Sequence, residues 1–232
     1  MAPQPPSRTG KDVRPMRLTR LGKKAAAVAT TAVVASTLTA APAFAHGTAQ
    51  PLKTRSLAAV LTADKSGFDR NGRDYDILTA AVQAVLKAKP ASPVGVLADG
   101  NTALTAFLPD DHAFELLVAD IQHSKRLPSE KAAFTAVAGL GIDTVESVLL
   151  YHVVPGATID RKAALKADGA KLKTAAGATV TVDVYGFCVK RIALIDADTS
   201  DRNPRVNRFD INKGNKQIAH GIDRVLRPID LP

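Results

Sequence analysis

The stretch LTAFLPDDHAF (residues 104–114) carries the clearest local pattern in this 232-residue chain. Its first half is apolar and rich in strand-forming residues, which predicts a β-strand. Pro109 ends that strand, because proline has no N–H to give to a strand ladder. Asp110 or Asp111 is then expected to cap a helix, since a carboxylate oxygen accepts the unpaired N–H groups of a first helical turn.

Two aromatic rings flank this strand-to-helix corner. Phe107 precedes the proline, and Phe114 lies in the first turns of the expected helix. Phe114, Leu117 and Ile121 recur at helical spacing and so share one face. We therefore expect both rings to pin the corner to the hydrophobic core.

Outward from this corner, helices are expected first. Ile77 to Leu86 carries an apolar stripe at intervals of three and four residues, which is typical of a helix packed on a core. Polar residues that suit N-caps precede several other segments. The expected helices are residues 57–61 after Ser56, residues 77–86 capped by Asp74 or Asp76, a helix after Ser129, and a helix opened by a capping box at residues 143–146.

Strands are expected later in the chain. Residues 180–184 alternate valine with polar residues, which predicts a half-buried strand. Residues 187–195 are predicted to form the next strand, and residues 196–215 a long polar loop. Residues 218–226 are predicted to form the closing strands. Helices followed by strands indicate an α+β fold rather than the alternating βαβ order of nucleotide-binding folds.

The N-terminus predicts export. Residues 1–24 are basic, residues 25–40 are uncharged and apolar, and a small-x-small pattern ends at Ala45. This order is typical of a secretory signal peptide, and the apolar run is too short to span a membrane. We expect a signal peptide over residues 1–45 that is cleaved between Ala45 and His46, with translation starting at Met1 or at Met16.

A flexible leader is expected over residues 46–55 and one folded domain over residues 56–230. The whole chain carries a net charge of +9, but residues 1–45 hold seven of its basic residues and one acid. The remainder has 24 basic and 21 acidic residues, a net charge of +3. The high pI therefore belongs mainly to the signal peptide, and nucleic-acid binding is not expected. No membrane span is expected after the signal is removed.

Motifs for catalysis and for cofactors are missing from the sequence. It contains no zinc-protease, phosphate-loop or nucleophile-elbow motif, and its five histidines show no short metal-ligand spacing. The single Cys188 lies in an apolar run, and we expect it to be buried as a small hydrophobe. These absences favour a non-enzymatic protein without a cofactor or a zinc ion.

Two acidic loops raise the question of calcium. Residues 69–74 and residues 196–201 each cluster aspartates, which are ligands that Ca²⁺ prefers. Neither loop fits the twelve-residue calcium loop, and arginines interrupt both. Solvated turns with aspartate caps are the favoured interpretation, with calcium as the alternative.

Three segments together resemble the fasciclin-like (FAS1) domains. Residues 104–114 are similar to the first signature of that family, residues 149–156 (LLYHVVPG) to its central Tyr-His segment, and residues 218–228 (IAHGIDRVLRP) to its second signature. The order matches, and the resemblance covers roughly residues 56–230. It implies a wedge-shaped β-sandwich with helices packed around it. One departure is Gly221, where the family commonly has an apolar strand-forming residue.

The resemblance also draws attention to a set of signature side chains. Their roles are expected to be mainly structural. His152 falls on the inward face of its expected helix, where a histidine is usually held by hydrogen bonds. The alternative is an adhesion epitope, because the Tyr-His segment of animal members is implicated in receptor contact. The signature residues are Phe107, Pro109, Phe114, Tyr151, His152, His220 and Asp223.

The expected function is that of a secreted, non-enzymatic FAS1 interaction module. It would mediate adhesion, matrix or cell-surface contacts, with a protein or a polysaccharide as the partner and an oligomeric state that the sequence leaves open. The alternative is a carrier that holds a small apolar ligand between sheet and helices. A third hypothesis, an exported hydrolase, would use His152 or His220 as its base.

Overall fold

The computed structural model describes residues 51–229, which belong to one compact unit. The expected signal peptide, its cleavage point at Ala45 and His46, and the first half of the expected leader lie outside the described residues. The same holds for residues 230–232.

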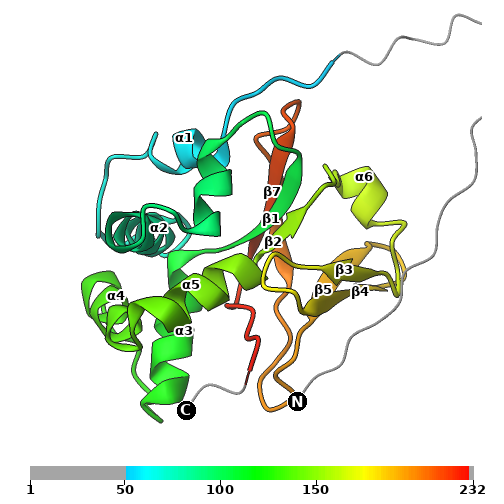
Figure 1. Cartoon of the computed structure of the whole chain (residues 1–232). Coiled ribbons are helices and arrows are strands. Elements are labelled where there is room, and N and C mark those ends of the chain that lie inside the picture. Colours follow the sequence, from blue (N-terminus) through cyan, green and yellow to red (C-terminus); the bar gives the residue numbers. More distant parts are fainter. Residues whose placement is uncertain (1–50, 230–232) are drawn as a thin grey trace, which may run out of the picture. The chain divides into compact units, whose positions relative to one another are not determined.

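The described chain is an α+β fold with most of its helices on one side of a central pair of strands. Figure 1 shows α1 to α5 on one side of β1 and β7, with α6 and the strands β3 to β5 on the other. The elements in order are α1 (Leu57–Leu61), α2 (Asp76–Ala88), the 3₁₀ helix η1 (Pro93–Ala98), β1 (Leu104–Pro109), α3 (Asp111–Ile121), α4 (Glu130–Gly139), α5 (Ile142–Tyr151), β2 (Val153–Pro155), α6 (Arg161–Ala164), β3 (Lys171–Lys173), β4 (Thr179–Tyr185), β5 (Arg191–Ile195), β6 (Val206–Ile211) and β7 (Gln217–Ile222).

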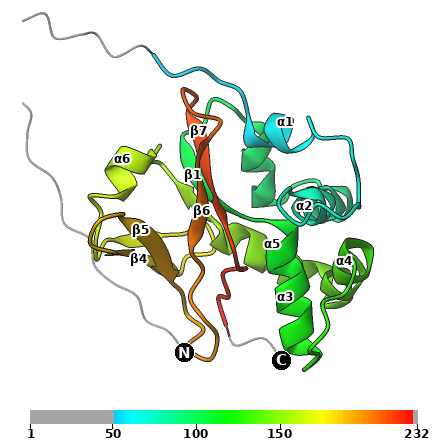
Figure 2. The same cartoon turned by 180° about the vertical axis from the view of Figure 1, so that it is seen from behind.

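The first sheet has the strand order β2-β1-β7-β6. Its two central strands, β1 and β7, run parallel, with Leu104 opposite Gln217 and Pro109 opposite Ile222. Both strands are buried along their whole length, and most of their residues are apolar, although β7 also carries the buried Gln217 and His220. In Figure 2, seen from behind, β6 covers the far edge of β7.

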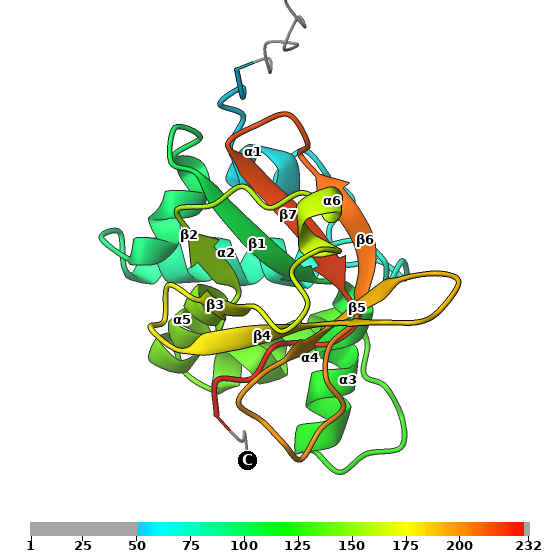
Figure 3. The ribbon, with the colours of Figure 1, turned by 90° about the vertical axis from the view of Figure 1, so that its right-hand side faces the viewer.

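The second sheet has the order β3-β4-β5 and is antiparallel throughout. In Figure 3, β4 runs across the direction of β1 and β7 rather than along it. One hydrophobic cluster fills the space between the two sheets and includes Phe107, Val180 and Leu194. A second cluster lies between the first sheet and the helices and includes Phe114 and Leu117. The two rings of the strand-to-helix corner thus anchor separate cores.

Several strand predictions need correction. The strand expected over residues 187–195 begins only at Arg191, because Gly186 starts a turn with φ of 95°. Cys188 lies in that turn and is exposed, so the prediction of a buried cysteine was wrong. The expected loop over residues 196–215 contains β6, and the closing strand ends at Ile222 instead of continuing to residue 226.

Three expected N-caps are confirmed. Ser56, Asp110 and Ser129 each accept a hydrogen bond from the backbone N–H three residues on, at 3.2, 3.0 and 3.4 Å. These caps depend only on neighbouring residues in the chain, which is why the sequence shows them.

Two other cap predictions were wrong. Tyr75 precedes α2, and its side chain makes no capping hydrogen bond. The first N–H groups of α2 instead donate to the Asp111 carboxylate of α3, from Asp76 at 3.0 Å and from Ile77 at 2.8 Å. The predicted capping box does not form, because α5 starts after Gly141, and Glu146 instead binds a lysine and a serine beyond α2. A distant residue takes the place of the local cap at α2, whereas α5 has no side-chain cap.

No single helix within residues 51–229 has the length and apolar composition to cross a membrane. The helices α4 and α5 meet those criteria only as a pair, and the pair is bent by 107°.

Candidate interaction groove

The apolar signature residues lie in the interior. Phe107 and Phe114 are 4% and 3% exposed, and Pro109 is buried at the end of β1. These three side chains are therefore not accessible to a binding partner. They hold the corner between β1 and α3, where His112 is the one exposed residue in the first turn of α3.

Tyr151 and His152 are also buried. The Tyr151 hydroxyl donates to the Thr179 carbonyl at 3.1 Å. The ring of His152 bridges two segments: its Nδ1 donates to the Val148 carbonyl at 2.7 Å, and its Nε2 accepts from the Leu226 N–H at 2.9 Å. Burial lowers the pKa of His152 to about 4, against the opposing effect of the Val148 carbonyl, so the ring is neutral at pH 7.

His220 lies in β7 with both ring nitrogens engaged. Its Nε2 donates to the Ile159 carbonyl at 2.8 Å, and its Nδ1 accepts from the Asp210 N–H at 3.2 Å. Burial lowers its pKa below the ordinary value. Neither His152 nor His220 therefore presents a ring nitrogen to a substrate, as a general base must.

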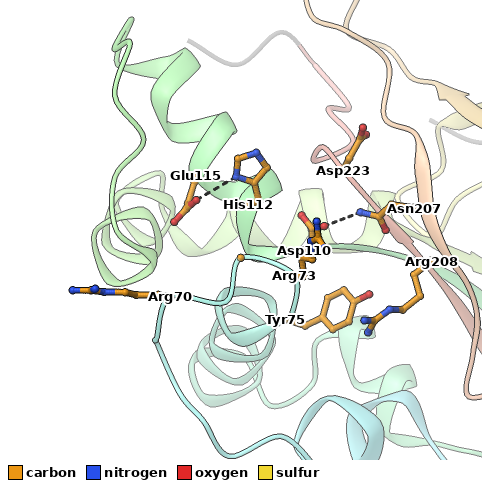
Figure 4. Close-up of a pocket in the computed structure, with 10 residues that line it drawn as sticks. Arg70, Arg73, Tyr75, Asp110, His112, Glu115, Asn207, Arg208 and Asp223 are labelled. Atoms are coloured by element: carbon orange, nitrogen blue, oxygen red, sulfur yellow. Dashed lines mark hydrogen bonds and ion pairs between the residues drawn. The ribbon is translucent and has the colours of Figure 1, made fainter.

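A solvent-facing groove lies beside the β1–α3 corner. It has a volume of about 780 Å³, and the loop before α2, the first turns of α3 and strand β6 form its walls (Figure 4). Asp223, the residue after β7, is the one signature residue that lines it. The lining residues are Arg70, Gly72, Arg73, Tyr75, Asp110, His112, Glu115, Asn207, Arg208 and Asp223.

The groove combines both charges with an aromatic ring. The guanidinium of Arg208 lies 6.0 Å from the centroid of the Tyr75 ring, within range of a cation–π contact. Burial raises the pKa of Tyr75 to about 12, so its hydroxyl stays protonated. The Asp110 carboxylate caps α3 and also accepts a hydrogen bond from the Asn207 side-chain amide at 2.7 Å. Burial raises the pKa of Asp110. Such a surface offers hydrogen bonds and charge pairs to a polar partner.

Gly221 makes room for two of the groove side chains. A Cβ placed on Gly221 would stand 2.6 Å from the Tyr75 hydroxyl oxygen and 2.8 Å from Oδ1 of Asn207. The apolar residue that is common at this position in the family would therefore push both side chains out of place. The departure from the family pattern is thus part of how this groove is shaped.

We expect Gly221→Val to disturb the groove and to lower stability by about 1–3 kcal/mol, because a side chain is forced into filled space. The measurement is the free energy of unfolding in urea. Gly139→Ala is the matched control, since no heavy atom lies within 4 Å of its Cβ position. A valine variant as stable as the control would show that Tyr75 and Asn207 move aside freely.

The apolar cavities of the described fold are small. Two such cavities, one beneath α3 and α5 and one between the sheets, have volumes of about 20 Å³ each. That space holds about one water molecule, whereas ligand pockets are typically about 300–1,000 Å³. The structure therefore gives no support to a carrier of apolar ligands.

The second acidic loop is neutralised by arginines. Arg227 contacts Asp198 at 3.2 Å, Asp120 at 2.9 Å and Asp201 at 3.3 Å. Arg224 contacts Asp201 at 2.8 Å. Asp223 and Arg224 directly follow β7, which is a central strand of its sheet.

Comparison with known proteins identifies the family. A model of the fasciclin domain matches residues 77–228. No curated protein sequence matches the chain. Among solved structures, it is similar to a FAS1 domain pair from the insect cell adhesion molecule Fasciclin I, with 17% identity and a TM-score of 0.52 over 75% of this chain. The match covers 51% of that chain, so the protein spans about half of its length. The protein belongs to the fasciclin (FAS1) domain family.

Proposed function

We propose that this protein is a secreted, non-enzymatic interaction module that mediates adhesion or cell-surface contacts through the groove beside the β1–α3 corner. The family supports the class, since FAS1 domains are generally extracellular and related to adhesion, and the insect protein with a similar structure is a cell adhesion molecule. The partner is a protein or a polysaccharide of the cell surface or matrix.

The observation that carries the proposal is the contrast between the groove and the signature segments. The groove is about 780 Å³ and is lined by the exposed side chains of Arg70, Arg73 and Arg208. The Tyr-His segment, by contrast, is buried at both rings. Arginine and tyrosine are frequent among residues that dominate binding, because they combine apolar area with directed hydrogen bonds. The groove is therefore the better contact surface.

Other features agree with a binding role. In both His152 and His220, the two ring nitrogens form hydrogen bonds within the fold. Neither ring is therefore free to act as the base that the hydrolase hypothesis requires. The small apolar cavities disfavour the carrier. The groove lining holds three arginines against three carboxylates, which suits a polar partner of mixed charge better than a polyanion.

Replacing Arg70 and Arg73 together with alanine is expected to weaken binding to the producer's cell surface at least about tenfold, because exposed interface arginines often contribute more than 1 kcal/mol each. The measurement is saturation binding of the labelled chain to whole cells and to purified envelope polysaccharide. Binding to polysaccharide alone would identify that partner class.

The matched control removes Lys171 and Lys173, two exposed charges on β3 in the other sheet. Both double variants should keep the melting temperature within about 2 °C, since surface changes away from special features cost little. Equal binding by the arginine variant and the wild type would refute the groove as the contact surface.

A further inference from the structure

A cluster of carboxylates lies where the loop before α2 meets the start of α3 and α4. It forms two groups of three, and in each group one oxygen from every member lies within 4.8 Å of the others. Asp76 belongs to both groups. The first group is Asp69, Asp76 and Glu130, and the second is Asp74, Asp76 and Asp111. We call these five residues the acidic cluster.

Hydrogen bonds hold the cluster in position through some of its oxygens. Oε2 of Glu130 accepts the Asp69 N–H at 2.6 Å, and Oδ2 of Asp74 accepts the Asn71 side-chain amide at 2.9 Å. Both oxygens of Asp111 accept backbone N–H groups at the start of α2. The carboxylates are therefore oriented by the fold, as ligands are in preformed sites.

Three other oxygens of the cluster are buried without a hydrogen-bond partner among the described residues. They are Oδ1 of Asp74, Oδ2 of Asp76 and Oε1 of Glu130. Their residues are 8%, 9% and 2% exposed. A buried carboxylate oxygen without a partner costs folding free energy, and a bound cation would remove this cost for all three oxygens.

The cluster also lacks a basic partner. Within residues 51–229, no lysine, arginine or histidine forms an ion pair with any of the five carboxylates, and the neighbouring Arg70 and Arg73 line the groove. Burial, together with the neighbouring aspartates, raises the pKa of Asp76 and of Glu130. Asp198 shows the opposite arrangement, because Arg227 supplies the counter-charge there.

We infer that the acidic cluster binds a hard divalent cation of the Ca²⁺ type, with Asp76 at its centre and Asp74 and Glu130 supplying further free oxygens. The donors are all carboxylate oxygens, which suits Ca²⁺ and not zinc, an ion that favours nitrogen and sulfur. The cation joins the loop before α2 and the first residue of α2 to the start of α4, and so fixes the loop from which two groove arginines project.

The binding test uses the purified full chain after treatment with EDTA. Calorimetric titration with CaCl₂ should give saturable heat, and MgCl₂ should bind more weakly, because Mg²⁺ demands stricter octahedral geometry. At a hundredfold excess of Ca²⁺ over its Kd, the melting temperature should rise by about 5–10 °C. The absence of saturable heat with both ions would overturn the inference.

Matched variants separate a cation site from an ordinary acidic surface. Asp76→Asn should abolish the calcium-dependent shift and should melt higher than the wild type in EDTA, because it removes like-charge repulsion. Glu130→Gln should weaken the shift while the Asp69 N–H keeps its acceptor. Asp198→Asn, in the arginine-paired loop, should keep the full shift. Equal shifts in all three variants would contradict the site. The titration contains no adhesion partner, so its outcome is independent of the proposed function.

Discussion

His152→Ala is expected to lower the free energy of unfolding by about 3–5 kcal/mol and the melting temperature by about 10 °C. The change leaves the Val148 carbonyl and the Leu226 N–H without their partner and opens a cavity where the ring was. These two groups belong to α5 and to the segment after β7, so the ring joins distant parts of the chain. Urea unfolding followed by circular dichroism measures the loss.

His112→Ala is the control for this variant. His112 is exposed, and its contact with Glu115 at 3.4 Å is long, so its removal should change stability by less than about 0.5 kcal/mol. A His152 variant that is as stable as the wild type but no longer binds cells would support the epitope interpretation instead.

The stabilisation by His152 should also depend on pH. Its pKa is about 4 in the folded chain and about 6.5 in an unfolded chain, so the unfolded state binds more protons between these values. Stability from this ring is therefore complete above pH 6.5 and falls as the pH decreases toward 4. The difference in unfolding free energy between wild type and His152→Ala should shrink by about 2–3 kcal/mol from pH 7 to pH 4.5. A difference that stays constant would show that the ring titrates normally.

Arg227→Met is the second change with a large expected effect, a loss of about 3–5 kcal/mol. The Asp198 side chain is 1% exposed, and Arg227 is its partner ion. Burial alone would raise the pKa of Asp198, but hydrogen bonds from Ser200 and the charge of Arg227 hold it below the ordinary value. Without Arg227, a charged carboxylate would remain buried. Thermal unfolding at pH 7 measures the loss.

A second substitution tests that explanation. Adding Asp198→Asn to Arg227→Met should restore part of the stability, because the buried charge is then removed while Ser200 keeps its acceptor. Arg224→Met alone should cost less, since the Asp201 and Asp120 that it contacts are 19% and 46% exposed. Additive losses in the double variant would mean that Arg227 does not stabilise the fold through Asp198.

The parts of the fold that the sequence predicts are those decided by near neighbours. The β1–α3 corner depends on a proline and on the Asp110 cap, all within a few residues. The α2 cap was predicted wrongly because Asp111, its true acceptor, is more than thirty residues away. Strand β6 escaped prediction because its register shifts against β7 and Asp210 adopts φ of 61°, which destroys simple alternation.

The groove could not be predicted for the same reason. Its walls come from residues near 70, near 112 and near 208, and the last of these lay in a segment expected to be loop. The acidic cluster is an intermediate case. Residues 69–74 were noticed as a calcium candidate, but Asp111 and Glu130, which complete the cluster, carry no pattern that links them to that loop.

The parallel pairing of β1 with β7 has a consequence for how the molecule acquires its fold. Leu104 pairs with Gln217, and the ring of His152 accepts a hydrogen bond from the Leu226 N–H. Neither the β1–β7 pairing nor this hydrogen bond can form until the end of the domain is available. Contacts of such long sequence separation slow folding, because the intervening chain loses entropy before any contact forms. A chain that lacks this last segment cannot complete the first sheet, because β7 is one of its central strands. The apolar faces of the helices that pack on this sheet are then exposed to proteases and chaperones.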